Sequence, residues 1–268
     1  MWTKTSAWKY SPTWKTTPST AARITAWRLT SNFKPMKIGL FGYGKMGKMI
    51  EGLAPGRGHE IRARIDAPGD PAPFDQLDVA IDFSSPEAAF DNIARCLEAG
   101  VPVVSGTTGW LHRYDAICRQ CEETGGAFIY ASNFSLGVNL FFSLNEYLAD
   151  LMSGQDAYSA SIDETHHTEK VDAPSGTAIT LAEGILERTP YTGWSSGSGN
   201  AGELPVHSHR EGTVPGTHLV TYASAVDQIE IRHTAHNREG FALGALVAAE
   251  WLIGKKGVFT MKDVLNLR

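Results

Sequence analysis

The feature that most constrains this fold is a glycine-rich turn between a predicted strand and a predicted helix. Residues 36–41 form a short apolar run of strand length, and a helical pattern starts at Lys48. Between them, Gly42, Gly44 and Gly47 have the spacing G-x-G-x-x-G. The first glycine permits a tight turn, the second lets backbone N–H groups approach a pyrophosphate, and the third lets the helix pack closely. The motif predicts a dinucleotide-binding turn made of Gly42, Tyr43, Gly44, Lys45, Met46 and Gly47.

A carboxylate follows the second predicted strand, residues 59–65. Asp66 lies 24 residues after Gly42, near the position where dinucleotide folds place the acid that accepts from the ribose hydroxyls. The alternative is a structural role, in which Asp66 opens the turn 66–69. Because a carboxylate repels a 2′-phosphate, Asp66 at the ribose predicts that NADH is used at least as well as NADPH.

Strands and helices then alternate along the chain. The pattern predicts strands at 77–83, 101–104 and 127–131, with helices at 87–99 and 112–123. Such alternation is typical of an α/β fold with a doubly wound, parallel sheet of the Rossmann type. Ligands of these sheets bind at the carboxyl ends of the strands. We therefore expect two small polar loops, 106–109 and 131–135, to contact the cofactor.

The pattern changes in the second half of the chain. Helices are predicted at 137–152, 178–188 and 241–253, strands at 157–164, 204–210, 218–223 and 228–234, and a glycine- and serine-rich loop at 193–202. Strands that follow one another indicate an antiparallel or mixed sheet, and hence a second domain of α+β type. We expect a dinucleotide-binding domain at 36–132 and 238–268, and a substrate-binding and oligomerisation domain at 133–237.

One short segment concentrates chemically active side chains. His166, His167 and Lys170 follow the end of a predicted strand, and the turn Ser175-Gly176-Thr177 opens the next helix. Backbone N–H groups at a helix start bind carboxylates, and the lysine adds a positive charge. Histidine can donate a proton near neutral pH. The pattern favours a site for an anionic substrate, although a solvated loop with chance histidines is the alternative.

The first 35 residues differ from the rest of the chain. They contain six Lys or Arg, twelve Ser or Thr and four of the seven Trp, and no Asp or Glu precedes Glu51. We expect residues 1–35 to be a disordered or non-native extension, with Met36 as the natural start. The alternative is an organelle transit peptide. Without this segment, 18 basic and 29 acidic residues give a net charge of −11.

Composition excludes several classes of protein. The net charge of −5 argues against nucleic-acid binding, and no apolar run is long enough to cross a membrane. Three cysteines, which leave one unpaired, favour a reducing compartment. Cys118 and Cys121 lie within a helical pattern and are read as ordinary helix residues. The nine histidines are scattered over several strands, so no metal site is expected.

Residues 166–178 resemble the signature of the 4-hydroxy-tetrahydrodipicolinate reductase (dihydrodipicolinate reductase) family of bacterial lysine biosynthesis. The resemblance extends from Met36 to the C-terminus and includes the glycine-rich turn 42–47 and the segments 82–87, 106–109, 131–139 and 233–245. The string H-H-x-x-K-x-D-A-P-S-G-T is specific to this family.

The resemblance implies an oxidoreductase of the diaminopimelate pathway. It would reduce a cyclic dicarboxylate with NADH or NADPH to tetrahydrodipicolinate and water, as a cytoplasmic homotetramer built through the second domain's sheet. His166 would be the proton donor and Lys170 the second acid. The substrate carboxylates would be bound by His167, Ser175, Gly176 and Thr177. The resemblance also implies that the two cofactor loops make their contacts through Gly106, Thr107, Thr108, Ala131, Ser132, Asn133 and Phe134. Arg238 is a further carboxylate clamp by its chemistry.

Two other functions stay open on the sequence alone. One is another two-domain nicotinamide oxidoreductase, which acts on a small anionic substrate such as a sugar or a semialdehyde. A semialdehyde dehydrogenase needs a nucleophilic cysteine in a loop, whereas the three cysteines fall in predicted helices. The other is a non-catalytic dinucleotide sensor, which would not need the His166–Lys170 cluster.

Overall fold

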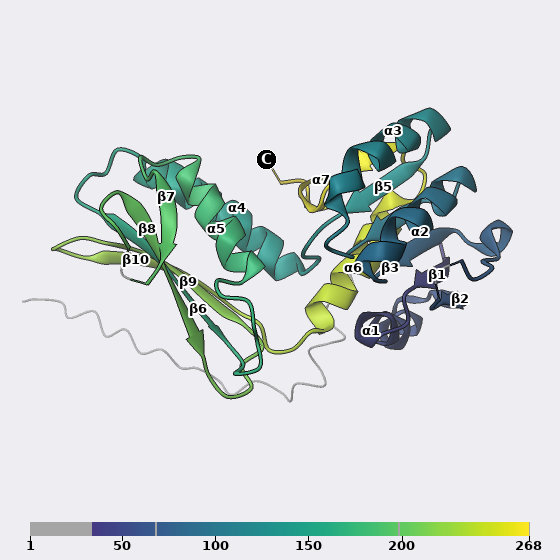
Figure 1. Cartoon of the computed structure of the whole chain (residues 1–268), viewed down its shortest axis with the longest axis horizontal. Coiled ribbons are helices and arrows are strands. Elements are labelled where there is room, and N and C mark those ends of the chain that lie inside the picture. Colours follow the sequence, from purple (N-terminus) through teal and green to yellow (C-terminus); the bar gives the residue numbers. More distant parts are fainter. Residues whose placement is uncertain (1–33, 68, 198, 268) are drawn as a thin grey trace, which may run out of the picture. The chain divides into compact units, whose positions relative to one another are not determined.

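The computed structural model describes residues 34–67, 69–197 and 199–267 (Figure 1). The expectation about residues 1–35 therefore lies outside the described residues, except for Lys34 and Pro35, which are exposed. In the described part of the chain, no helix is both long and apolar enough to cross a membrane.

The first sheet has six strands, all parallel, in the order β11-β5-β4-β3-β1-β2. Its strands are β1 (Lys37–Phe41), β2 (Glu60–Ile65), β3 (Val79–Asp82), β4 (Val103–Ser105), β5 (Ala127–Tyr130) and β11 (Gly257–Phe259). The connecting helices are α1 (Lys45–Leu53), α2 (Pro86–Glu98), α3 (Tyr114–Thr124), α6 (Glu239–Leu252) and α7 (Met261–Leu265), with short 3-10 turns η3 (Pro55–Arg57), η4 (Phe74–Gln76) and η5 (Leu111–Arg113).

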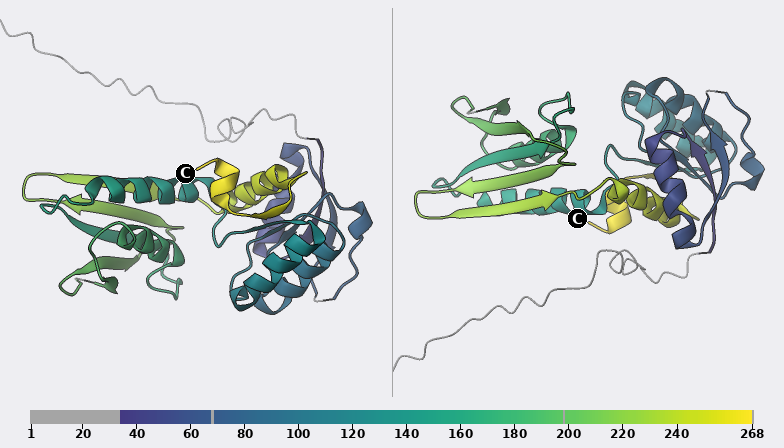
Figure 2. Two further views of the ribbon diagram at one scale, coloured as in Figure 1. Left: turned by 90° about the horizontal axis from the view of Figure 1, so that it is seen from above. Right: turned by 90° about the horizontal axis from the view of Figure 1, so that it is seen from below.

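Both faces of this sheet are buried. Every residue of β3 and β4 is buried, as expected for a parallel sheet covered on both sides. Ile81 packs in a core with residues of α1 and α6, while its neighbour Ala80 packs with residues of α2 and α3. Figure 2 shows α6, from the C-terminal part of the chain, beside α1 from its start. The predicted Rossmann-type fold is confirmed.

The second sheet is mixed, in the order β10-β9-β6-β8-β7. Its strands are β6 (Ser159–His166), β7 (Gly193–Ser196), β8 (Glu203–Arg210), β9 (Thr217–Ala223) and β10 (Gln228–Thr234). The strand β6 is parallel to β8 and antiparallel to β9. The helices α4 (Leu136–Met152) and α5 (Gly176–Leu186) pack on one face. Burial alternates along β6, so the other face is only partly covered.

The sequence pattern misses two short strands. The loop predicted at 193–202 contains the strand β7, which pairs with β8. The helix predicted last, at 241–253, is followed by β11 and α7, and β11 adds an edge strand beside β5. Both missed strands are three or four residues long, too short for an alternating pattern to show. The proposed domain boundaries remain a prediction.

Candidate active site

The glycine-rich turn has the local geometry that the sequence predicts. Gly42 has φ of +88°, and a Cβ there would lie 2.2 Å from the Phe83 carbonyl oxygen. A Cβ on Gly47 would lie 2.4 Å from the Gly42 oxygen. These two glycines are therefore required by packing. Gly44 differs, because no atom lies within 4 Å of its Cβ position. The space beside Gly44 is open, as the approach of a phosphate requires.

This turn fits a dinucleotide. No side chain caps the start of α1 at Gly44, so the first N–H groups of the helix can bind an anion. A pocket of about 260 Å³ adjoins the turn and is lined by Gly42, Tyr43, Gly44, Ile65, Asp66, Ala67, Phe83, Ser84, Ser85, Ala88 and Asn92. Lys45 is exposed, and Met46 is partly buried.

Asp66 lies in this pocket at the end of β2. One carboxylate oxygen accepts a hydrogen bond from the Tyr43 N–H at 2.8 Å, and the residue is exposed. The contact fixes the carboxylate beside the turn, and the second oxygen accepts no hydrogen bond from the described residues. A cation is also close, because the Arg64 guanidinium lies over the Tyr43 ring at 5.7 Å. Arg64 is already paired with Glu51.

A buried carboxylate that sequence reasoning missed organises the next loop. Asp82, at the end of β3, accepts hydrogen bonds from Ser84, Asn92, Ser105 and Thr107 at 2.6–3.4 Å. Burial raises the pKa of Asp82, and the four donors oppose that rise. The donors come from the ends of β3 and β4 and from α2, so Asp82 connects three segments around the predicted cofactor loops.

The structure limits what Thr107 can offer a cofactor. Its hydroxyl donates to Asp82 and accepts from the Ser84 N–H at 2.9 Å, and its carbonyl accepts from the Trp110 ring N–H at 2.8 Å. The side chain thus serves the loop itself, and the backbone N–H is the group left for a ligand. Gly106 is partly buried and Thr108 is exposed.

The loop after β5 lies close to the start of α5. The Asn133 amide nitrogen lies 3.5 Å from the Thr177 hydroxyl, and its amide oxygen accepts from the Ser135 N–H at 2.9 Å. Phe134 is a core residue, with an exposed fraction of 1%. Ala131 is partly buried and Ser132 is exposed. The contact brings the predicted cofactor loop next to the predicted substrate turn.

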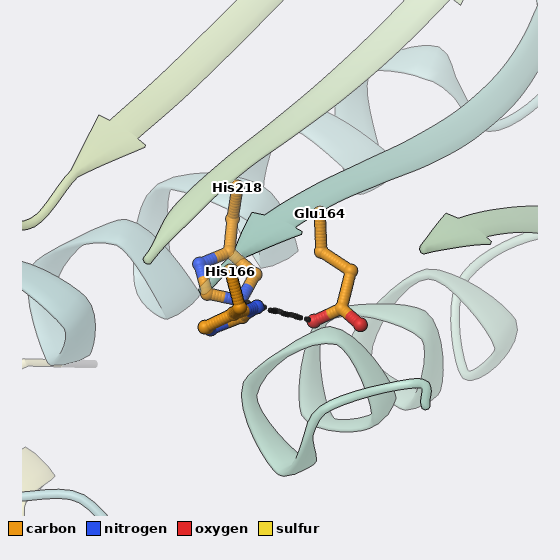
Figure 3. A group of neighbouring side chains, drawn as sticks. All are labelled: Glu164, His166 and His218. Atoms are coloured by element: carbon orange, nitrogen blue, oxygen red, sulfur yellow. Dashed lines mark ion pairs between the residues drawn. The ribbon is translucent and has the colours of Figure 1, made fainter. Parts of the chain in front are cut away.

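Three buried side chains converge at the end of β6 and on the neighbouring strand β9. Figure 3 shows Glu164, His166 and His218 with ring nitrogens of both histidines turned toward one carboxylate oxygen. His166 Nδ1 lies 3.1 Å from Glu164 Oε2, an ion-pair distance without the geometry of a hydrogen bond. Glu164 is paired with His218 in the strand register, and the two histidine rings are 5.1 Å apart.

The charges of this cluster follow from its surroundings. Burial alone would raise the pKa of Glu164, but the side chains of His166, Ser175 and Ser208 outweigh burial and lower it below its ordinary value. Burial, together with the nearby His166, lowers the pKa of His218 to about 4. Glu164 is therefore ionised and His218 neutral near pH 7.

The lysine of the motif is held by its own loop. Lys170 Nζ is 2.7 Å and 2.8 Å from the two Asp172 carboxylate oxygens, and this contact lowers the pKa of Asp172. Arg210, which sequence reasoning missed, donates to the backbone carbonyls of Lys170 and Asp172 and pairs with Glu164 at 3.3 Å. The motif loop is thus tied to the end of β8.

The anion-binding turn forms the start of α5. The Ser175 hydroxyl accepts from the Ala178 N–H at 3.2 Å and lies 3.1 Å from His218 Nε2. Gly176 is exposed, and its Cβ position is open. The uncrowded N–H groups of Gly176 and Thr177 remain available at an 11-residue helix.

The other two predicted substrate-binding residues, His167 and Arg238, make fewer contacts with the described residues. His167 is partly buried, beside His166 in the chain. Arg238 is exposed at the start of α6 and makes no ion pair with any residue that the structure describes. Glu164, Arg210 and His218 gave no motif signal, although the alternation of β6 places Glu164 and His166 on the same face. Cys118 and Cys121 lie in α3 as expected, and both thiols are free.

Family models match most of the chain. The model described as dihydrodipicolinate reductase, N-terminus, matches residues 36–134, and the model for the C-terminus of the same enzyme matches residues 137–265. The chain is also similar to a protein of Christiangramia forsetii named 4-hydroxy-tetrahydrodipicolinate reductase. The two are 53% identical over 234 residues, which cover 86% of this chain and 98% of the relative. A protein of the same name from Chromobacterium violaceum is 39% identical over 74% of this chain and 76% of its own length.

A solved structure agrees in fold. Dihydrodipicolinate reductase from Paenisporosarcina sp. TG-14 with dipicolinate bound aligns with a TM-score of 0.68 and 23% identity, over 85% of this chain and 98% of that one. A sequence signature in the motif loop, a dinucleotide turn and both family models thus lead to the same conclusion. The chain belongs to the dihydrodipicolinate reductase family of NAD(P)H-dependent oxidoreductases.

Proposed function

We propose that this protein reduces 4-hydroxy-tetrahydrodipicolinate to tetrahydrodipicolinate, with release of water, in the diaminopimelate route to lysine. The observation that carries the proposal is a set of contacts around Glu164: it contacts His166 and the Ser175 N–H, and Arg210 links it to the Lys170 carbonyl. His166, Lys170 and the turn 175–177 thus belong to one network, in which Thr177 lies 3.5 Å from Asn133. These groups supply an acid, a cation and an anion-binding turn, which a dicarboxylate with a reducible ring needs. The dicarboxylate class is supported by the dipicolinate bound to the structural relative.

The bound NADH or NADPH supplies the hydride. The turn 42–47 and Asp66 would hold the nucleotide, and the loops 106–108 and 131–134 would contact the nicotinamide. The N–H groups of Gly176 and Thr177, with Ser175, His167, Lys170 and Arg238, hold the two carboxylates of the substrate. Fixing both carboxylates orients the ring toward the nicotinamide, which lowers the entropic part of the barrier.

His166 is the proton donor in this proposal. Hydride addition to an unsaturated cyclic imine leaves electron density that a positioned acid must neutralise. Glu164 Oε2 lies 3.1 Å from Nδ1 of His166, so Nε2 is the ring nitrogen left to face the reacting atom. Lys170 acts as the second acid and holds a carboxylate, since Asp172 already fixes its ammonium group.

NADH is used at least as well as NADPH in this proposal. Asp66 places a carboxylate at the ribose end of the pocket, where it accepts from two hydroxyls but repels a 2′-phosphate. The nearby cation Arg64 is paired with Glu51, which reduces its attraction for a phosphate. A specificity ratio clearly in favour of NADPH would show that the role of Asp66 is misassigned.

We also infer a cytoplasmic homotetramer, joined through the second sheet. The face of this sheet away from α4 and α5 carries half-buried residues such as Asp163, His207 and Leu219. A partly covered sheet face is the surface that association of identical subunits would bury. Light scattering of the full chain tests the assembly, and a monomer at micromolar concentration would contradict it.

The test is NADH oxidation on addition of the coupled product of aspartate semialdehyde and pyruvate. We expect His166→Ala and Lys170→Ala each to lower turnover by about a hundredfold or more, the size of a general-acid contribution. The NADH dissociation constant should stay nearly unchanged, because other loops bind the nucleotide. His112→Ala, at an exposed histidine, and Lys262→Ala, at an exposed ion pair with Glu146, are the matched controls.

The outcomes separate this proposal from the two alternatives. A different two-domain oxidoreductase would bind NADH but leave it unoxidised with this substrate. A non-catalytic sensor would bind NADH and oxidise it with no substrate of this class. Turnover that survives both substitutions would make the motif structural and remove the proposed mechanism.

A further inference from the structure

We propose that Glu164, His166 and His218 form a binding site for a divalent transition-metal ion of the zinc class. Occupation of this site would inhibit the enzyme by engaging its proton donor. The inhibition rests on the proposed function, whereas the binding does not. The proposal replaces the expectation from sequence that the histidines are too scattered to bind metal.

The three ligand atoms are close enough for one ion. One nitrogen from each histidine and one Glu164 oxygen all lie within 4.8 Å of one another. Glu164 Oε2 is 3.1 Å from His166 Nδ1 and 3.8 Å from His218 Nε2. A tetrahedral zinc ion with bonds of about 2.0 Å keeps neighbouring ligand atoms about 3.3 Å apart. Small side-chain rotations would bring both separations to that value.

The donor types also suit zinc. Two imidazoles and one carboxylate form a known protein ligand set for zinc, with the fourth position open to water. All three residues are buried, and they come from adjacent strands of one sheet, β6 and β9. Strand positions are rigid, so binding would require little reorganisation.

The cluster contains unsatisfied polar atoms. Glu164 Oε2 and His166 Nδ1 are buried in the described chain without a hydrogen-bond partner. Buried polar atoms in native proteins nearly always have a partner, and an ion or a water is a common reason for an apparent exception. These two atoms are two of the three proposed ligands, so a cation would satisfy both at once. The third ligand, His218 Nε2, lies 3.1 Å from the Ser175 hydroxyl, a contact that the ion would replace.

Charge limits the affinity without preventing binding. Arg210 pairs with the other carboxylate oxygen, Oε1, at 3.3 Å. Its positive charge weakens the attraction for a cation, but it leaves Oε2 free for the metal. We therefore expect reversible binding, as in a regulatory site, rather than the permanent binding of a structural ion.

Metal binding would oppose proton donation. With the ion on Nδ1, the ring can carry only the Nε2 proton. Loss of that proton to the substrate would leave an imidazolate anion, which is costlier to form than the neutral imidazole left by an imidazolium donor. Turnover should therefore fall as the site fills, and it should recover when a chelator removes the ion.

Calorimetric titration of the chelator-treated full chain with Zn²⁺ tests binding directly. We expect one site per chain that is lost, or weakened by more than about 100-fold, in Glu164→Gln and in His218→Asn. His209→Asn is the matched control, because His209 pairs with Asp163 at 3.1 Å outside the cluster. Unchanged binding in Glu164→Gln, or loss of binding in His209→Asn, would overturn the proposal.

Two measurements on the wild-type chain keep the test valid if a variant does not fold. Co²⁺ in place of Zn²⁺ should give the intense visible absorption of a tetrahedral site. Ring-nitrogen NMR should show two of the nine histidines ligated in the zinc-bound chain. A weak octahedral Co²⁺ spectrum with no perturbed histidine would mean that a water fills the cluster, and the proposal would be wrong. Neither readout depends on turnover, so failure of the proposed function would be seen separately.

Discussion

Replacing Asp82 by asparagine tests whether a buried carboxylate holds the cofactor loops in place. The side chain accepts from Ser84 and Asn92 on one oxygen and from Ser105 and Thr107 on the other. An asparagine keeps the shape, but one oxygen becomes an NH₂ group. That group must face side chains that donate hydrogen bonds in the wild-type protein.

The size of the effect follows from these contacts. A hydrogen bond to a charged group contributes about 1.5–3 kcal/mol, and at least one such bond is lost outright. Removing the carboxylate recovers part of this loss, because burial disfavours the ionised form and raises its pKa. We therefore expect Asp82→Asn to lower the free energy of unfolding by about 2 kcal/mol. In a chain of this size that corresponds to a fall in Tm of about 4–8 °C.

Asp82→Asn should also weaken NADH binding, although the substitution removes no atom that contacts NADH. Thr107 would keep its contacts with Ser84 and Trp110 but would lose its hydrogen bond to the carboxylate. If reordering the loop then costs about 1.4 kcal/mol, the NADH dissociation constant rises tenfold. Fluorescence titration with NADH, beside thermal unfolding, measures both effects.

The control is Asp91→Asn in the same helix, α2, as Asn92. The Asp91 side chain is 73% exposed, and its ion pair with Arg113 spans 3.8 Å. An exposed pair of this kind contributes at most about 1 kcal/mol, so this variant should behave nearly as wild type. If Asp82→Asn matched the control in both Tm and NADH affinity, the network would have no role in placing the loop.

Two further predictions concern the first sheet and its helices. Gly47→Ala should lower the free energy of unfolding by about 1–3 kcal/mol and weaken NADH binding, because the new Cβ would lie 2.4 Å from a backbone oxygen of the turn. Gly52→Ala in the same helix is the comparison, because the space at its Cβ position is open. This substitution should raise the free energy of unfolding, measured in urea, by about 0.5–1 kcal/mol. Burial raises the pKa of Glu250, but contacts with His59 and Arg57 outweigh it and lower the value below 4.5. The stability that ionised Glu250 contributes is present above about pH 4.5 and is lost as the pH falls through the folded pKa. Glu250→Gln should therefore lower the free energy of unfolding by about 3 kcal/mol at pH 7. In unfolding curves measured at acid pH, the difference from wild type should be smaller.

The parts of the site that sequence predicts are those encoded locally. The turn 42–47 and the turn 175–177 need small residues at fixed spacings, and backbone geometry alone explains why. The partners of Asp82 and Glu164 are not encoded this way. Thr107 reaches Asp82 through the pairing of β3 with β4, and His218 reaches Glu164 through the register of β6 and β9. Contacts that depend on strand pairing leave no characteristic spacing in the sequence.

The same limit explains the missed elements. The strand β11 is three residues long and forms because β5 offers an unpaired edge, not because its own residues alternate. The strand β7 extends the second sheet beside β8 in a similar way. Local propensity is weak in segments this short, so the edge of an existing sheet decides their structure.

Asp82 and Glu164 illustrate one physical solution used twice. Each lies in a strand of a different sheet and is fully buried, and each accepts hydrogen bonds from the loop or turn that carries the ligand-binding groups. Short polar loops have too few apolar side chains to be held by packing, and their backbone groups must stay free for the ligand. A buried carboxylate that accepts hydrogen bonds from the loop fixes its position and leaves the ligand-facing backbone groups free. Substitutions at these two carboxylates should therefore change binding and turnover although neither one contacts the nucleotide.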